Sequence, residues 1–213
     1  MIVPGLLIVV SGPSGTGKGT ICQLLLKQRP DIFLSVSATT RSPRVGETDG
    51  KHYYFKEKSE FEAMLARDEF LEWASVYDNF YGTPRGPVAG ALAQGRDVLL
   101  EIDVQGALKV KQKAPDGTYL FVVPPSLEAL RARITGRGTD STEIINKRLG
   151  KAMEELSHLH EYDYVVINDV VAEAVAKVES IIAAEKSRTD RYRVADDAGP
   201  GTPLLVAKEN FSR

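Results

Sequence analysis

The chain has 213 residues, of which 43% are hydrophobic and 26% are charged, as in an ordinary globular protein. This length is long for one average domain and short for two, so we expect one core with an inserted or appended flap. The 27 basic and 29 acidic residues leave a net charge of −2, which excludes a field strong enough for non-specific binding to nucleic acid. Any basic site must therefore be local.

The apolar run at residues 2–10 contains Pro4 and Gly5, follows no cationic segment and precedes no small-residue cleavage site. We therefore expect neither a signal peptide nor a membrane span. Cys22 is the single cysteine, so an intramolecular disulfide is impossible, and we expect a small buried helix residue there. A cytoplasmic location is compatible with this cysteine content.

Strands and helices are predicted to alternate along the chain. Strand patterns occur at residues 6–10, 33–37, 53–55, 70–76, 97–103, 119–123 and 164–167. Helix patterns occur from residue 21 to Pro30 and at 59–67, 84–94, 104–113, 127–134, 140–159 and 170–186. This alternation predicts an α/β fold with a parallel sheet, right-handed crossovers and flanking helices. Residues 187–213 are expected to form a mobile extension.

Two of these helices carry local start signals. Ser59 and Glu62 have the spacing of a capping box, which would open the helix at 59–67. Thr83 followed by Pro84 predicts an N-cap and a proline at the first helical position. Asp78 and Asn79 predict a turn directly after the strand at 70–76.

A glycine-rich segment at residues 12–20 lies between the first strand and the first helix. In that position glycines let several backbone N–H groups point at one anion, and the helix N-terminus adds partial positive charge. Lys18 would then reach the β- and γ-phosphates of a nucleotide. Because Gly19 replaces the usual Ser or Thr, the hydroxyl that would face magnesium moves to Thr20, with contact through water. A plain glycine turn is the alternative, which the register of the glycines and the lysine disfavours.

Polar residues are predicted at the carboxyl ends of other strands, where open parallel sheets bind ligands. We expect Ser37 to end the second strand, and Glu101 and Asp103 to end the strand at 97–103. A period of two puts both acids on one side of that strand, and a carboxylate there typically orders a magnesium ion. The alternative for Asp103 is an N-cap of the helix that follows.

A second cationic segment lies in the polar loop at residues 38–51. Arg41 and Arg44, with Lys51 and the hydroxyl of Tyr53, would suit a phosphate group because guanidinium forks match phosphate oxygens. A solvated loop is the alternative.

Further arginines follow in the helical region near residue 137. Arg137 stands between two glycines, where a hinge is needed, and it would swing onto transferring phosphates. Exposed helix charges are the alternative for this group, which consists of Arg131, Arg133, Arg137 and Arg148.

Several further motifs occur in a fixed order along the chain. They are Ser37–Arg44, Gly46-Glu47, Gly50–Tyr53, Glu72-Trp73, Tyr81-Gly82, Glu101–Gly106 and Gly136-Arg137-Gly138. Through this series, residues 6–186 resemble the guanylate kinase family of P-loop nucleoside monophosphate kinases. The resemblance implies a core at 1–36 and 84–186, a GMP-binding flap at about 37–83 and a lid at about 135–148.

The resemblance also implies a role for individual residues. On the GMP side these are Arg41, Arg44, Tyr53 and Tyr81 for the phosphate, Ser37, Glu72, Thr83 and Asp103 for guanine, with Glu101 beside them. On the ATP side they are Gly12, Pro13, Ser14, Gly15, Thr16, Gly17, Lys18, Gly19, Thr20, Arg133, Arg137 and Arg148 for the phosphates and Asn168 for adenine. Catalytic roles fall to Lys18, Arg41, Arg137 and Arg148, and Thr20 and Glu101 would contact magnesium through water.

The implied reaction is ATP + GMP → ADP + GDP with magnesium, with dGMP as a second expected acceptor and a place in purine nucleotide metabolism. A carboxylate at Glu72 would accept from the N1–H and N2–H₂ of guanine, a donor pair that adenine lacks. The expected partners are these nucleotides, without nucleic acid, membrane or an obligate protein. The alternatives are a non-catalytic binding module of this fold, a kinase for a phosphorylated sugar, and an adenylate kinase.

Overall fold

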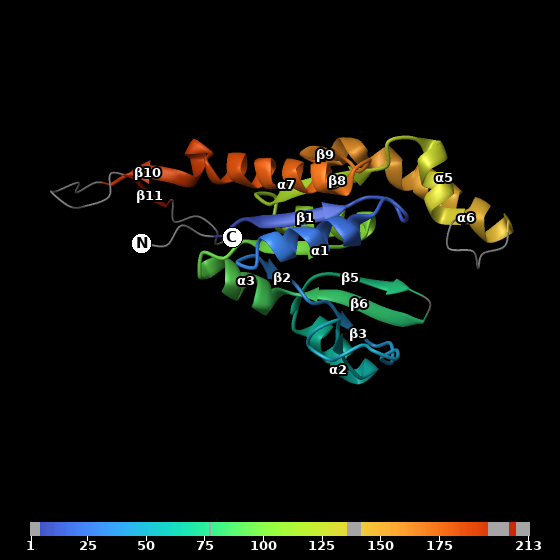
Figure 1. Ribbon diagram of the computed structural model, residues 1–213. Helices are drawn as coiled ribbons and strands as arrows, with labels where there is room; N and C mark the ends of the chain where they lie inside the picture. The colour runs from blue at the N-terminus through green and yellow to red at the C-terminus, as the bar shows by residue number, and fades with distance from the viewer. Residues whose placement is uncertain (1–4, 77, 136–141, 196–204, 208–213) are drawn as a thin grey trace.

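The computed structural model describes residues 5–76, 78–135, 142–195 and 205–207 (Figure 1). Within these residues, five parallel strands form the main sheet in the order β2-β7-β1-β8-β9. They are β1 (Leu7–Ser11), β2 (Phe33–Leu34), β7 (Val98–Glu101), β8 (Thr118–Val123) and β9 (Tyr164–Ile167). The predicted α/β fold with a parallel sheet is confirmed.

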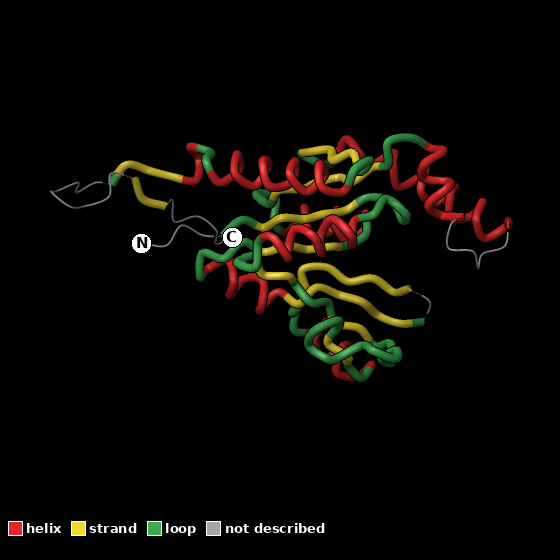
Figure 2. Tube along the Cα trace, in the orientation of Figure 1, coloured by secondary structure: helices red, strands yellow, loops and turns green. Residues whose placement is uncertain are grey.

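Helices cover both faces of this sheet, and Figure 2 shows them in red around the yellow strands. The covering helices are α1 (Lys18–Gln28), α3 (Arg85–Ala93), α4 (Val104–Lys113) and α7 (Val171–Lys186). Because successive strand residues point to opposite faces, β1 contributes to both cores. Ile8 and Val10 pack with residues of α1 and α7, whereas Leu7 and Val9 pack with residues of α3 and α4. This is why the strand is apolar without alternation.

The segment between β2 and α3, where the flap is predicted, has a small sheet of its own in the order β4-β3-β6-β5 and is called the flap below. Its elements are β3 (Ala38–Thr39), β4 (Tyr54–Phe55), α2 (Lys58–Ala66), β5 (Phe70–Val76) and β6 (Asn79–Pro84). Ala38, Phe61 and Phe70 are buried at its centre. In Figure 1 the arrow of β1 points right, the side on which the free end of the β5–β6 hairpin and helices α5 and α6 also lie. The carboxyl end of the main sheet therefore faces both the flap and these helices.

Strand assignments at the start of the flap differ from the prediction. The strand at 33–37 is wrong beyond Leu34, so Ser37 does not end a strand of the main sheet. Ala38 and Thr39 instead pair with β4 and β6 of the flap. Alternation predicted extended backbone but not the change of sheet, which depends on pairing with Tyr81 and Gly82 far along the chain.

Both predicted helix starts are also wrong. Helix α2 begins at Lys58 with Glu57 as its N-cap, and Phe61 N–H donates to the Glu57 carbonyl at 3.0 Å. Because α2 begins at Lys58, Ser59 lies inside the helix and does not cap it. Thr83 lies in β6 opposite Glu72, and Pro84 is the N-cap of α3. Strand pairing has overridden the local cap signal.

Helices α5 (Leu127–Thr135) and α6 (Thr142–Leu156) flank the predicted lid, and the 3₁₀ helix η1 (Ser157–Glu161) follows them. Leu130 and Ile134 of α5 pack against Ala152 of α6. The predicted Gly136-Arg137-Gly138 hinge lies outside the described residues, and the lid boundaries of 135–148 stay a prediction.

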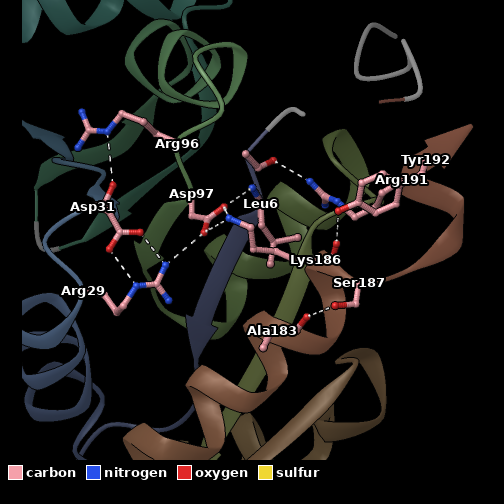
Figure 3. A network of polar contacts seen from close by, with 11 residues as sticks. Leu6, Arg29, Asp31, Arg96, Asp97, Ala183, Lys186, Ser187, Arg191 and Tyr192 are labelled. Atoms are coloured by element: carbon pink, nitrogen blue, oxygen red, sulfur yellow. Dashed lines mark hydrogen bonds and ion pairs between the residues drawn. The ribbon is translucent and has the colours of Figure 1, made fainter. Parts of the chain in front are cut away.

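A polar network ties the amino-terminal edge of the main sheet to the end of α7 (Figure 3). The buried Asp97 carboxylate accepts from Leu6 N at 2.9 Å and from Lys186 Nζ at 2.8 Å, and Arg29 lies 3.8 Å away. The extension begins here with η2 (Thr189–Arg191) and β10 (Tyr192–Val194), which pairs with β11 (Leu205–Ala207). The Tyr192 hydroxyl donates to the Lys186 carbonyl at 2.7 Å. The network therefore anchors the start of the extension, while the mobility expected for 187–213 stays a prediction.

Cys22 is 2% exposed on α1, as predicted, and burial raises the pKa of its thiol. A thiol of this kind is inert. Among the described residues, none of the helices is long and apolar enough to cross a bilayer.

Candidate active site

The phosphate loop, residues 12–20, connects β1 to α1. Gly12, Gly15 and Gly17 have φ angles of +136°, +89° and +87°, where a side chain would be strained. A Cβ at Gly12 would also lie 2.3 Å from the carbonyl oxygen of Val122. Strand, glycine loop and helix thus follow one another as the motif requires.

A cavity of about 580 Å³ opens at the junction of this loop with α1. Its lining gathers many of the residues predicted for the ATP side, together with Glu101 and Val171. They are Ser14, Gly15, Gly17, Lys18, Gly19, Thr20, Arg133 and Asn168. Segments that are far apart in the sequence therefore meet around one space large enough for a nucleotide.

Lys18 is held at the cavity by the loop itself. Its Nζ donates to the carbonyl oxygens of Gly12 at 2.5 Å and Pro13 at 3.0 Å. Burial lowers the pKa of the ammonium, and nearby acids, above all Glu101, act in the opposite direction. A phosphate oxygen would be a stronger partner for this cation than a neutral carbonyl.

Glu101 lies at the carboxyl end of β7, across from the start of α1. A Cβ built at Gly19 would lie 3.3 Å from its Oε1, so the missing side chain leaves room beside the carboxylate. Partial desolvation raises the pKa of the Glu101 carboxyl, while Lys18 opposes the shift. Thr20 is exposed at the same cavity.

Asp103 does not share a strand with Glu101, and the predicted common face of the two acids is wrong. Strand β7 ends at Glu101, and the period-two pattern holds only while the backbone is extended. Asp103 is the N-cap of α4, where its Oδ1 accepts from Gly106 N at 2.7 Å. The alternative prediction for Asp103, an N-cap of the helix that follows, is therefore confirmed.

Asn168 and Arg133 both contact the phosphate loop. Asn168 is 2% exposed at the end of β9, and its Nδ2 donates to the Thr16 carbonyl at 2.7 Å. Arg133 Nη2 donates to the Asn168 carbonyl at 2.8 Å, and Nη1 reaches the Thr16 carbonyl at 3.5 Å. The loop is thereby linked to both β9 and α5.

Helix α6 reaches the tip of the loop at Ser14. Arg148 Nη2 lies 3.4 Å from Ser14 Oγ, in agreement with a position on the ATP side. Glu155, which sequence reasoning missed, lies on the same face, and burial raises its pKa whereas Lys151 and the Ser14 backbone lower it. The spacing of seven residues from Arg148 could have identified it. Arg137 lies outside the described residues.

The predicted phosphate residues of the flap gather around Arg41. Its guanidinium donates to Glu47 Oε1 and to the Ser42 carbonyl, both at 2.8 Å, and lies 5.5 Å from the ring centre of Tyr53. The Tyr53 and Tyr81 rings meet edge to face at 6.0 Å, and burial raises the pKa of Tyr53.

Glu47 is the second residue that sequence reasoning left without a role. Its Oε2 accepts from Arg44 N at 2.8 Å while Oε1 holds Arg41, and these contacts lower the pKa of Glu47 to about 2. One carboxylate thus connects both predicted phosphate arginines. The sequence signal that could have identified Glu47 is its place as an acid among the loop cations Arg41, Arg44 and Lys51.

Glu72 and Thr83 face each other across β5 and β6. The Thr83 hydroxyl donates to Glu72 Oε1 at 2.7 Å, and burial raises the pKa of this carboxyl while that hydrogen bond lowers it. A Cβ at Gly106 would lie 3.2 Å from both Glu72 Oε2 and Asp103 Oδ1. Because Gly106 lacks that atom, the two carboxylates approach the same spot. Ser37 lies just before β3, where its carbonyl accepts from Tyr54 N at 2.9 Å.

A parallel α/β core with a phosphate loop after its first strand, faced by a flap with an arginine site, defines a P-loop phosphotransferase. Comparison with known proteins narrows this class. A family model described as "Guanylate kinase" matches residues 5–185, and the chain belongs to the guanylate kinase family.

Individual relatives agree with this assignment. The guanylate kinase of Caldanaerobacter subterraneus subsp. tengcongensis is 59% identical over 189 residues, which are 89% of this chain and 92% of that protein. The guanylate kinase of Carboxydothermus hydrogenoformans is 53% identical over 197 residues, or 92% and 97% of the two chains. The crystal structure of guanylate kinase from Anaplasma phagocytophilum superimposes with a TM-score of 0.71 at 36% identity and covers 88% of this chain and 89% of its own.

Proposed function

We propose the mechanism by which this chain carries out the reaction of its family. In that reaction the γ-phosphate of ATP is transferred to GMP, and ADP and GDP are released. ATP binds in the cavity at the phosphate loop, and GMP binds at the flap. The observation that carries this proposal is the presence of separate cationic sites, one at Lys18 and one at Arg41, with the buried Glu72 carboxylate on the same flap as the second.

The ATP phosphates replace the loop carbonyls as partners of Lys18. The loop N–H groups and the start of α1 supply further positive potential, and Arg133 and Arg148 approach the loop from α5 and α6. These groups neutralise charge as it shifts toward the leaving ADP. Arg137 is assigned to the same task by family resemblance.

The residues around Gly19 fit a hydrated magnesium ion. The space that a Cβ would fill beside Glu101 Oε1 is open, and Thr20 lines the same cavity. Glu101 and Thr20 would hold the ion through water, in keeping with the reluctance of magnesium to lose its waters. Bound there, magnesium would screen the negative charge of the transferring phosphoryl group.

Guanine is recognised by two carboxylates, Glu72 on the flap and Asp103 at the start of α4. The N1–H and N2–H₂ groups of GMP donate to Glu72 and Asp103, and Thr83 holds the Glu72 carboxylate in place. Adenine would leave the buried Glu72 carboxylate without these donors, and such a mismatch costs about 10⁴-fold or more in selectivity. Ser37 lies at the adjoining edge, and Arg41, Arg44, Tyr53 and Tyr81 bind the GMP phosphate.

No covalent enzyme intermediate is required. A phosphate oxygen of GMP attacks the γ-phosphorus, the bond from that phosphorus to the β,γ-bridging oxygen breaks, and its electron pair leaves with ADP. The protein contributes positioning and charge neutralisation. Closure of flap and lid would exclude water, which otherwise competes as the acceptor.

A coupled assay of ADP release tests this assignment. GMP and dGMP should support turnover, whereas AMP and UMP should support little, and the acceptor should be required for most ADP release. If no ADP is released with any of these acceptors, the chain would be a binding module. A preference for AMP would overturn the guanine assignment.

A further inference from the structure

The peptide that joins Thr16 to Gly17 is held in place from outside the phosphate loop. Its carbonyl oxygen accepts from Asn168 Nδ2 at 2.7 Å and lies 3.5 Å from Arg133 Nη1. The Thr16 side chain is fully buried, and its hydroxyl donates back to the Pro13 carbonyl at 2.9 Å. The orientation of this peptide is therefore set by Asn168, which directly follows β9, and by Arg133 of α5.

That orientation determines where the next N–H points. In a trans peptide the C=O of one residue and the N–H of the next point in opposite directions within one plane. When Asn168 fixes the Thr16 carbonyl, the Gly17 N–H must point to the opposite side. Gly17 is the N-cap of α1 and lines the cavity, so this N–H belongs to the anion-binding end of the helix.

Asn168 is itself rigidly placed. Its backbone N donates to the Val123 carbonyl at 2.8 Å, which continues the pairing of β9 with β8. Its own carbonyl accepts from Arg133. A Cβ at Gly17 would lie 2.4 Å from Asn168 Nδ2, so the amide is packed directly against the loop.

We infer that Asn168 is a positioning residue for phosphoryl transfer: its amide donates to the Thr16 carbonyl and thereby aims the Gly17 N–H at the phosphates of ATP. This role differs from the adenine contact that family resemblance implies for Asn168, and it rests on the proposed ATP site. An adenine contact would use Oδ1, which is buried and lacks a hydrogen-bond partner within the described residues. The two roles therefore use different atoms of one side chain.

The two roles can be separated by comparing two phosphoryl donors, ATP and purine riboside triphosphate. The second lacks the 6-amino group of adenine. With Asn168→Ala we expect kcat to fall about 100-fold, as for loss of one preorganised donor, by the same factor for both nucleotides. The KM for GMP should stay within about twofold of the wild type. Asn168→Ser serves in the same comparison if the alanine variant does not fold. A loss confined to ATP, expressed in its KM, would overturn the inference in favour of adenine recognition.

The isosteric variant Asn168→Asp gives a second test. A protonated aspartic acid can still donate to the Thr16 carbonyl, whereas a carboxylate cannot. Because position 168 is buried, a carboxyl group there is expected to have a raised pKa, and the kcat of this variant, divided by that of Asn168→Ala, should rise as the pH falls from 8 to 5. The charged groups around position 168 are Arg133 on α5, Lys18 on α1 and Glu101 on β7, with Asp169 next in the chain. These groups are present in both variants, so the ratio reduces their own contribution to the pH profile.

A purely structural role predicts another pattern. Both variants would then lose melting temperature, and their kcat ratio would not change with pH, which would contradict the inference. Failure of the proposed function is recognised separately, because the wild type would then release no ADP in response to GMP.

Discussion

The proposed ATP (donor) and GMP (acceptor) sites of this molecule are built differently. At the donor site, Lys18 and Asn168 bond to backbone carbonyls of a loop that is fixed to the main sheet. At the acceptor site, Arg41 is held by the carboxylate of Glu47, and both side chains are partly exposed. The donor site rests on the large core of the sheet, whereas the flap rests on a small cluster around Phe61 and Phe70.

This difference assigns different tasks to the two sites. Backbone groups fixed before the reaction stabilise developing charge without reorganising, so damage to the donor site should appear in kcat. Partly exposed ion pairs contribute little to stability and rearrange easily, so damage to the acceptor site should appear in GMP affinity and selectivity. Substitutions on each side can test this division.

The largest effect is expected for Lys18→Ala. Loss of a cation that contacts the transferring phosphates should lower kcat by about 10²–10³-fold, measured by ADP release at saturating GMP. The melting temperature should not fall, because burial already disfavours the Lys18 ammonium. Lys27→Ala, at an exposed position of the same helix, is the control and should be fully active. A Lys18 variant with near-normal turnover would refute its role.

Glu72→Gln should act on selectivity instead. Removing the carboxylate weakens hydrogen bonds to two guanine donors, each worth about 1.5 kcal/mol or more when charged, so the ratio of kcat/KM for GMP to that for AMP should fall about 100-fold. The fold should survive, because a glutamine oxygen can still accept from Thr83. Glu62→Gln on exposed α2 is the control. If the GMP to AMP ratio is unchanged, Glu72 does not read the base.

The donor site is also the one that the sequence predicts better. The phosphate loop is contiguous, and its glycines, lysine and flanking elements report on each other locally. Its contacts to Asn168, by contrast, span 152 residues, and no pattern around Asn168 indicates which of its atoms meets the loop.

The flap shows why the rest could not be predicted. Thr83 has a good local N-cap context, yet its partner is Glu72 on a neighbouring strand, and cross-strand pairing is not encoded in either segment alone. Ser37 was misplaced for the same reason, because alternation cannot distinguish the small sheet from the main one. Glu47 and Asp103 act through close contacts that depend on the folded loop and on the missing side chain of Gly106.

Glu47→Gln should have a smaller effect that is confined to the acceptor side. Glu47 connects Arg41 to the Arg44 backbone, so its loss should loosen the phosphate site and raise the KM for GMP about tenfold, with kcat changed less. Glu60→Gln removes another exposed ion pair of the flap, with Lys56, and should leave the KM unchanged. A lower KM for GMP in Glu47→Gln would mean instead that Glu47 competes with the substrate phosphate.

The smallest effect concerns the pH dependence of GMP binding in Thr83→Val. Burial raises the pKa of Glu72, and the hydrogen bond from Thr83 lowers it, so removal of the hydroxyl should raise this pKa further. Because the ionised carboxylate is the form proposed to accept from guanine, the KM for GMP should rise as the pH falls through this pKa. In Thr83→Val that rise should begin at higher pH, while at the alkaline end of the profile the two proteins should differ by about twofold at most. Thr83→Ser keeps the hydroxyl and should follow the wild type. If the pH profile of the KM in Thr83→Val superimposes on those of both other proteins, Thr83 does not control the base site.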